Sequence, residues 1–175
     1  MTISKFEGSW RRMEYKGILK IKNNQQIKII VFDDYAHHPT EIEKTLEAFK
    51  EKYPLSPIVC IFEPHQIKRL KILFKEFILS FKNADIIFIL PEYQVKGRDE
   101  NLNSKFNSYN LFKKLLKKYH QKPIFYLKNY KEIQNKIKEL FEKKLIKFKS
   151  KNNNDVILIM MGAGDIYKYT NQLIK

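Results

Sequence analysis

The chain has 175 residues, of which 43% are hydrophobic and 30% charged, and it contains only five glycines and six prolines. This composition supports one packed core, and it excludes a disordered chain as well as a collagen-like or linker-dominated one. We therefore expect residues 1–175 to form a single domain.

Neither a membrane segment nor a disulfide framework is visible in the sequence. The longest apolar runs, such as 156–161, are far shorter than the roughly 18 residues that a membrane helix needs, and residues 1–5 do not begin an apolar signal segment. The single cysteine, Cys60, lies in the apolar run 58–62, which indicates a buried structural thiol. We expect a cytoplasmic protein with no membrane partner.

Positive charge is concentrated in the second half of the chain. The sequence has 34 Lys plus Arg against 19 Asp plus Glu, and residues 101–175 hold 17 of the lysines but only five acidic residues. The resulting net charge of +15 is compatible with a basic nucleic-acid-binding module. These lysines, however, fall on the predicted outer faces of helices and accompany no RNA-binding or zinc-finger motif. Solvated helix surface is therefore favoured, and no nucleic-acid partner is expected.

Arginine is rare among these basic residues. Only four of the 34 are arginines, namely Arg11, Arg12, Arg69 and Arg98. A planar guanidinium binds carboxylate or phosphate with two parallel hydrogen bonds, so these positions are candidates for ligand contacts. The alternative, that a lysine-rich composition simply leaves four arginines, is equally compatible with the counts.

The first elements along the chain are expected to be extended. Residues 12–33 contain β-branched stretches that are separated by Gly17 and by a turn at Asn23-Asn24, a pattern that predicts an opening hairpin or small meander. A helix is predicted from Pro39, with Thr40 and Glu43 at the spacing of a capping box.

Strands and helices then alternate to the end of the chain. Strands are predicted at 58–62, 86–90, 124–127 and 156–161, and a polar loop runs from 91 to about 104. The apolar stripes of the intervening helices include Leu70, Leu73, Phe74, Phe77 and Phe81, then Leu111, Phe112, Leu115, Leu116 and Tyr119, and finally Ile133, Ile137, Leu140 and Phe141. The order predicts an α/β fold, a Rossmann-like and mainly parallel sheet with helices on both faces, opened by the N-terminal hairpin.

The densest group of polar side chains is Asp-Asp-Tyr-Ala-His-His-Pro-Thr at residues 33–40, directly after a predicted strand. Ligands of open parallel sheets bind beyond the carboxyl ends of the strands. Two carboxylates, a phenol and two imidazoles could position a nucleotide or phosphate, act as acid and base, or hold a divalent metal. The structural alternative is that an aspartate caps a turn and a histidine packs in the core.

Polar residues recur at the following strand exits. Glu63, His65 and Arg69 follow the strand at 58–62, and the exit after 86–90 carries Tyr93 and Arg98. The first two exits predict one shared cleft, whereas the third is equally compatible with a solvated surface loop.

Glycine usage limits the nucleotide chemistry. The sequence contains no Gly-x-x-x-x-Gly-Lys-Ser/Thr motif, so any ATP chemistry must take its phosphate-binding loop from elsewhere. Gly162-Ala163-Gly164 begins like a dinucleotide-binding fingerprint, but Tyr167 occupies the place of its third glycine. Tight packing of the last helix against the sheet explains these glycines better.

Four motifs, in order along nearly the whole chain, resemble the C-terminal domain of the Mur ligases. Residues 6–14 are similar to the family's Phe-x-Gly-x-x-Arg-Arg-x-Glu segment, and residues 33–42 match its Asp-Asp-Tyr-(Ala/Gly)-His-His-Pro-Thr-Glu-Ile block. Residues 62–69 are similar to its Phe-(Gln)-Pro-His-x-x-x-Arg turn, and residues 161–166 match its closing motif. The histidine block is highly specific, whereas the other three motifs would be weak alone.

The pattern favours the alanine-adding branch of this family. Tyr35 and Glu41 are usually Phe and Ala in the branch that recycles murein tripeptide, which stays as an alternative. The resemblance implies an ATP-dependent ligase of three domains, in which an amino-terminal domain binds the UDP-sugar and a central P-loop domain binds ATP with Mg²⁺. Those two domains are absent from residues 1–175, so this chain would be the third domain, which closes on the others.

The implied reaction belongs to peptidoglycan synthesis. ATP phosphorylates the carboxylate of UDP-N-acetylmuramate, and the amine of L-alanine then attacks the acyl phosphate. The residues implied to face the ATP phosphates and the reacting carboxylate are Asp34, Tyr35, His37 and His38. Those implied to hold the amino acid or the acyl phosphate are Arg69 and His65, with Arg12 and Arg98 as secondary candidates. None of them is a self-sufficient catalytic residue or a metal ligand, so the chain alone is not expected to be active.

Two residues depart from the family pattern, and two unrelated functions stay open. Gln66 stands where the family usually has an arginine, which removes one cationic group from the amino-acid site, and Tyr167 replaces a frequent glycine. One alternative is a metal-dependent phosphoesterase that uses the aspartates and histidines of residues 33–38, although no second carboxylate set has metal-ligand spacing. The other is the nucleic-acid-binding module.

Overall fold

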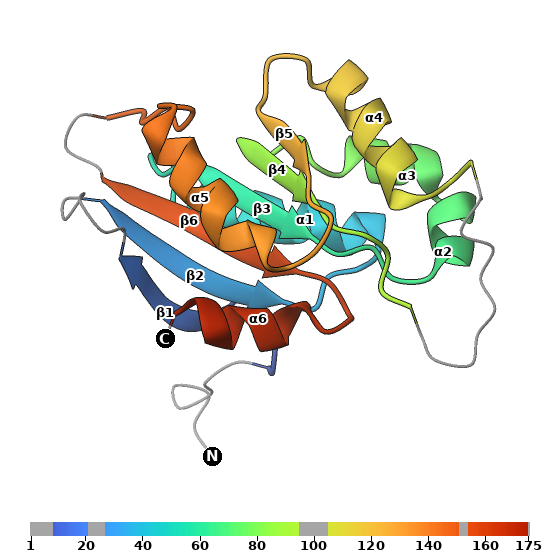
Figure 1. Ribbon diagram of the computed structural model, residues 1–175, viewed down its shortest axis with the longest axis horizontal. Coiled ribbons are helices and arrows are strands. Elements are labelled where there is room, and N and C mark those ends of the chain that lie inside the picture. The colour runs from blue at the N-terminus through green and yellow to red at the C-terminus, as the bar shows by residue number, and fades with distance from the viewer. Residues whose placement is uncertain (1–8, 21–26, 95–104, 151–153, 175) are drawn as a thin grey trace.

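The computed structural model describes residues 9–20, 27–94, 105–150 and 154–174 (Figure 1). A six-stranded sheet has the strand order β1-β2-β6-β3-β4-β5. The elements along the chain are β1 (Glu14–Lys20), β2 (Lys28–Asp34), α1 (Pro39–Lys52), β3 (Ile58–Phe62), α2 (Ile67–Ile72), α3 (Phe74–Leu79), β4 (Ile86–Ile89), α4 (Ser108–Lys118), β5 (Ile124–Tyr126), α5 (Glu132–Glu142), β6 (Asp155–Met161) and α6 (Ile166–Leu173).

The sheet confirms the predicted fold class. β1 and β2 form an antiparallel hairpin, whereas β2, β6, β3, β4 and β5 pair in parallel. Gly17 does not interrupt β1 but follows a bulge at Lys16, since the register shifts between Tyr15 and Gly17. The turn predicted at Asn23-Asn24 lies outside the described residues.

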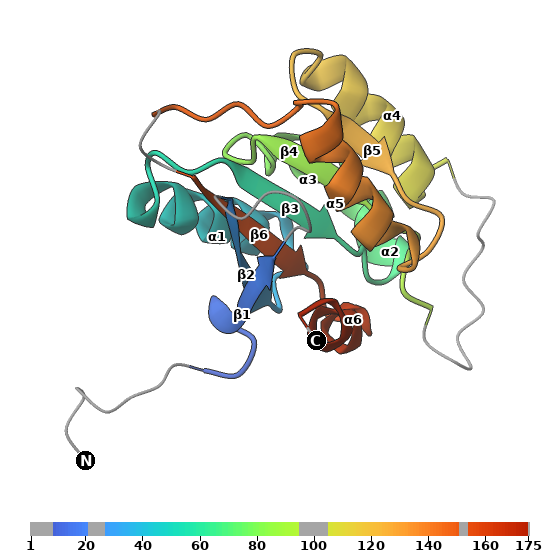
Figure 2. The ribbon, with the colours of Figure 1, turned by 60° about the vertical axis from the view of Figure 1, so that its left-hand side comes forward.

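Helices cover both faces of the sheet (Figures 1 and 2). α1, α2, α3 and α4 contribute to the hydrophobic core on one face, and α5 and α6 contribute to the core on the other. The inner strands β3 and β4 are buried along their whole length, because a parallel sheet in this arrangement has no solvated face. Cys60 of β3 is fully buried, as predicted, and burial raises the pKa of its thiol.

Two predicted helix features are wrong. The single helix expected from the apolar stripe of Leu70 to Phe81 is divided into α2 and α3 at Leu73, whose backbone leaves the helical conformation at φ −107° and ψ 26°. No glycine or proline marks this break, so the apolar repeat did not show it. α1 is not capped by Thr40 and Glu43 but by His38, the residue before Pro39, because proline is well suited to the first helical position.

The exits of β2, β6 and β3 lie against one another. The amide of Gly162 donates to the carbonyl of Asp34, and the amide of Glu63 donates to the carbonyl of Met161. Gly162 has φ +151°, and a Cβ atom there would lie 2.7 Å from the carbonyl oxygen of Glu63. A Cβ atom at Gly164 would lie 2.4 Å from the ring of Tyr93. Both glycines are therefore required by the close approach of these exits.

We expect Gly162→Ala to lower the free energy of unfolding by about 2–3 kcal/mol, because it adds backbone strain and a clash with main-chain atoms. Gly17→Ala is the matched control, since Gly17 also has a positive φ, of +143°, but its added Cβ would meet only Ile174 at an ordinary 3.6 Å. In urea unfolding, the free energy of unfolding of this control should fall by about 1 kcal/mol. Equal losses in the two variants would contradict the role given to the close approach.

Candidate functional site

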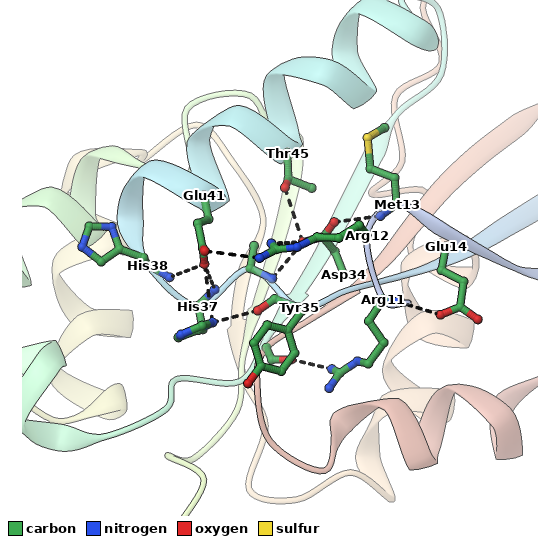
Figure 3. A network of polar contacts seen from close by, with 12 residues as sticks. Arg11, Arg12, Met13, Glu14, Asp34, Tyr35, His37, His38, Glu41 and Thr45 are labelled. Carbon is green, nitrogen blue, oxygen red and sulfur yellow. Dashed lines mark hydrogen bonds and ion pairs between the residues drawn. The ribbon is translucent and has the colours of Figure 1, made fainter. Parts of the chain in front are cut away.

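Asp34, at the end of β2, holds the opening turn of the chain against the sheet (Figure 3). One carboxylate oxygen accepts a hydrogen bond from the amide of Met13 at 2.9 Å, and the other accepts one from the amide of Ala36 at 2.8 Å. The Arg12 guanidinium lies 3.8 Å from the same carboxylate. Burial raises the pKa of Asp34, and these contacts oppose the rise. The carboxylate is thus committed to structural contacts, and it orients the neighbouring residues.

Glu41, in the first turn of α1, organises the histidine block. One of its carboxylate oxygens accepts hydrogen bonds from the amides of His37 at 3.0 Å and His38 at 3.2 Å. The other lies 3.4 Å from a guanidinium nitrogen of Arg12. Burial raises the pKa of Glu41, but the hydrogen bonds outweigh it and the net direction is downward. The sequence motif contained Glu41, yet its organising role was not predicted.

The two adjacent histidines are held differently. Nδ1 of His37 lies 2.9 Å from the carbonyl oxygen of Tyr35 and 3.4 Å from the carboxylate of Glu41, so Nε2 is the ring nitrogen that a ligand can reach. Nδ1 of His38 instead accepts a long hydrogen bond from the amide of Thr40, at 3.4 Å. Figure 3 shows the His38 ring pointing away from Tyr35. The structure therefore places His38 outside the group that Tyr35 and His37 form.

A row of rings crosses the strand exits. The Tyr35 and His37 rings lie 5.0 Å apart, His37 and His65 lie 6.1 Å apart, and His65 stacks on Tyr93 at 5.4 Å with an interplanar angle of 12°. These residues follow β2, β3 and β4. The structure thus brings the first two polar exits together, and it adds the third through Tyr93.

Arg11, one of the four arginines that the sequence offered as candidate ligand contacts, is the largest fully buried side chain among the described residues. Its guanidinium donates to the carbonyl oxygens of Gly162 and Gly164, and it lies 5.3 Å from the Tyr35 ring and 4.7 Å from the Tyr167 ring. Burial lowers the pKa of Arg11, and Asp33 and Glu63 oppose this change. The Arg-Arg pair of the first motif was the signal that could have identified it.

Trp10 continues the aromatic surface beside Arg11. Its ring lies 5.6 Å from the Arg11 guanidinium and contacts the Tyr167 ring edge-on at 5.9 Å. The Trp10 side chain is 68% exposed, in contrast to the buried arginine beneath it.

Two further guanidinium groups belong to this edge. That of Arg12 is accessible, and that of Arg69 is partly enclosed. Arg12 is 45% exposed, and it lies 5.8 Å from the Tyr35 ring while pairing with Asp34 and Glu41. Arg69 lies in α2, and its Nη1 is buried without a hydrogen-bond partner in the described part of the chain. In the same part, no hydrogen bond or ring contact joins Arg69 to Tyr35 or His37. Arg98 lies outside the described residues.

Two buried carboxyl groups fix α6 below this edge. Glu63 accepts hydrogen bonds from the Tyr130 hydroxyl and from the amide of Ile166, and Asp33 accepts one from the Thr170 hydroxyl. Burial raises the pKa of Glu63 to about 8 and that of Asp33 to about 6. Glu63 is thus mainly protonated at neutral pH, a state that its position after a buried strand did not reveal.

The described ranges contain no group of three or more His, Cys, Asp and Glu side chains arranged to hold a metal ion. None of their helices has the length and apolar composition that a bilayer crossing requires.

Glu63→Gln should remove a pH dependence of stability. The folded pKa of about 8 exceeds the ordinary 4.5, so the unfolded chain releases a proton that the folded chain keeps, and stability falls as pH rises between these values. The slope reaches about 1.4 kcal/mol per pH unit. The free energy of unfolding, measured with urea, should change less with pH in the variant than in the wild type over this range. The variant should also be more stable than the wild type near pH 8.

Asp33→Asn is the control for the Glu63 measurement. The folded pKa of Asp33, about 6, exceeds the ordinary 3.8. This variant should therefore reduce the pH dependence of the free energy of unfolding only between those two values. Parallel profiles for wild type and Glu63→Gln above pH 6 would contradict a protonated Glu63.

Comparisons with known proteins identify the family. Residues 11–164 match the family model described as Mur ligase, glutamate ligase domain. The chain is 34% identical to the UDP-N-acetylmuramate–L-alanine ligase of Ruthia magnifica, with 94% of this chain and 31% of the relative covered. It is 39% identical to the ligase of the same name in Clostridium botulinum, with 95% and 31% covered. The chain thus spans about a third of the length of these relatives.

A solved structure has the same fold. The crystal structure of the UDP-N-acetylmuramate–alanine ligase of Thermotoga maritima superposes with a TM-score of 0.62 at 24% identity. The match covers 98% of this chain and 31% of that one. Together with the family match over residues 11–164, this places the fold and most of the sequence in one family. The chain therefore belongs to the Mur ligase C-terminal domain family.

Proposed function

We propose that this chain is the closing domain of an alanine-adding Mur ligase, which joins L-alanine to UDP-N-acetylmuramate with ATP. The named relatives support the reaction, and the row of Tyr35, His37 and His65 across two strand exits is the observation that carries the site. The domain is incomplete as an enzyme, because the sequence has no phosphate-binding loop. The UDP-sugar-binding and ATP-binding domains would therefore be its partners.

Arg12 and Tyr35 are the proposed contacts to ATP and the acyl phosphate. Asp34 and Glu41 hold the guanidinium of Arg12 against the Tyr35 ring, and this arrangement fixes a half-exposed positive charge in one orientation. A preorganised cation stabilises the negative charge that develops during phosphoryl transfer. Asp34 acts here through Arg12 and not by facing the phosphates. Mg²⁺ would be held by the ATP-binding domain, since the described residues offer no group of metal ligands.

Arg69 and His65 are the proposed contacts to L-alanine. The buried Nη1 of Arg69 has no partner in the described residues, and a substrate carboxylate would satisfy this donor with a charge-assisted hydrogen bond. Gln66, immediately before α2, has φ 65° and stands where the family usually has a second cation. The amino-acid site would thus depend on one guanidinium.

Domain closure would bring these groups to the reacting atoms. The amine of L-alanine attacks the acyl carbon, the C–O bond to phosphate breaks, and inorganic phosphate leaves while the amine loses a proton. The acyl phosphate hydrolyses in water, so a domain that covers it raises the yield of amide. The adjacent rings of Tyr35, His37, His65 and Tyr93 would form part of this cover.

A chimera tests the proposal directly. The corresponding domain of the Clostridium botulinum ligase would be replaced by this chain, because the two are 39% identical over 166 residues. We expect ADP release that requires both UDP-N-acetylmuramate and L-alanine, and none from the isolated chain. A chimera that folds and binds ATP but releases no ADP would refute the assignment to an active alanine-adding ligase.

Arg69→Ala in the active chimera should raise the KM for L-alanine by about tenfold to a hundredfold, because a charge-assisted hydrogen bond is lost. The KM for UDP-N-acetylmuramate should change little. Lys71→Ala is the matched control, since Lys71 is an exposed cation of the same helix. An equal effect of both variants would show that general positive charge, and not a specific contact, attracts the amino acid.

A further inference from the structure

A second cavity lies beside the row of rings, between the exits of β3, β4 and β5 and helix α6. Its volume is about 450 Å³, and its wall includes Glu63, Tyr93, Lys128, Tyr130, Tyr169 and Gln172. An adjoining cavity of about 250 Å³ shares Tyr130, Tyr169 and Gln172 with it. Figure 1 shows α5 and α6 on the same side of the sheet, where they flank this region. A position beyond the carboxyl ends of parallel strands is where ligands of such sheets bind.

The cavity is separated from the proposed L-alanine contacts by Tyr93. One side of this residue stacks on His65, and the ring also lies against Gly164, where even a Cβ atom would not fit. Glu63 lies on the cavity side, and its buried carboxyl group bonds to Tyr130 of the opposite wall. The cavity therefore borders the candidate site without being part of it.

Three tyrosines and three amide side chains line the wall, together with five residues of charged type. Tyr130 and Tyr169 stack with their ring centroids 3.8 Å apart and an interplanar angle of 15°, and Tyr93 adds a third ring. Gln172 and Asn129 supply amides. Phenols and amides both donate and accept hydrogen bonds, as the hydroxyl groups of a ligand require.

The charged groups of the wall are largely committed to one another or to the protein. Asp165 pairs with Lys168 at 3.0 Å, and Glu92 accepts hydrogen bonds from the amide and the hydroxyl of Ser108. Burial keeps Glu63 mainly uncharged at neutral pH. Lys128 alone does not make the strongly cationic pocket that a phosphate would select. The wall thus fits an uncharged ligand.

We propose that this cavity binds a neutral pyranose sugar, a function beyond the ligase reaction. The apolar face of a sugar ring packs on an aromatic side chain, while its hydroxyl groups reach the phenols and amides around it. The volume lies within the range of about 300–1,000 Å³ that is usual for small-molecule sites. Three tyrosines and three amides line this space, beside the buried carboxyl group of Glu63.

The test is a titration of the ¹⁵N-labelled chain with N-acetylglucosamine, followed by NMR. We expect saturable shifts of the Asn129, Asp165 and Gln172 amides, with little change at His37. L-Alanine and inorganic phosphate are the counter-probes and should leave the cavity amides unchanged. An absence of saturable shifts with the sugar would overturn the proposal. Shifts of these amides with L-alanine instead would make the cavity an extension of the amino-acid site, which would refute the sugar site but not the proposed function.

Variants connect the shifts to the cavity wall. Tyr169→Ala should weaken sugar binding about tenfold, because it removes an aromatic face. Tyr109→Ala, at a 49% exposed tyrosine of α4, is the matched control and should have no effect. If Tyr169→Ala does not fold, Gln172→Ala replaces it, since Gln172 is exposed and its loss should weaken binding about threefold through one hydrogen bond. Unchanged affinity in the folded variant would overturn the proposal.

Discussion

The buried guanidinium of Arg11 is the interaction on which the geometry of this edge depends. A fully buried charge is costly unless it is paired and hydrogen-bonded, and here two carbonyl groups after β6 and the rings of Tyr35 and Tyr167 surround it. The carbonyl of Arg11 also accepts the amide of Tyr35, at 2.7 Å. One residue near the start of the chain thereby fixes the exit of β2 relative to the closing glycine segment.

The other polar contacts build outward from this centre. Asp34 and Glu41 together orient Arg12, and Glu41 also holds the backbone of the histidine block. Most conspicuous side chains of that block therefore serve to place three groups: the Arg12 cation, the Tyr35 ring and Nε2 of His37. This cluster of acidic and basic residues mainly positions its neighbours, because most of its hydrogen bonds are made to other groups of the protein.

Much of the fold follows from local patterns, whereas the site depends on distant partners. Strands such as 58–62 and 156–161 were predictable because a buried parallel strand is apolar on both faces. The break at Leu73 was not, since its cause lies in packing and not in a local breaker. The burial of Arg11 was equally hidden, because its carbonyl partners lie more than 150 residues further along the chain. The burial that raises the pKa of Glu63 likewise comes from the packing of distant elements, which local sequence does not reveal.

The exposure of Trp10 has a practical consequence for studying this molecule. It is the only tryptophan of the chain, and it stands at the rim of the edge against Arg11 and Tyr167. An indole that is 68% exposed changes its emission when another surface covers it, and here the signal comes from one known position. The fluorescence of Trp10 can therefore report the binding of another domain or molecule at this rim, without an attached dye.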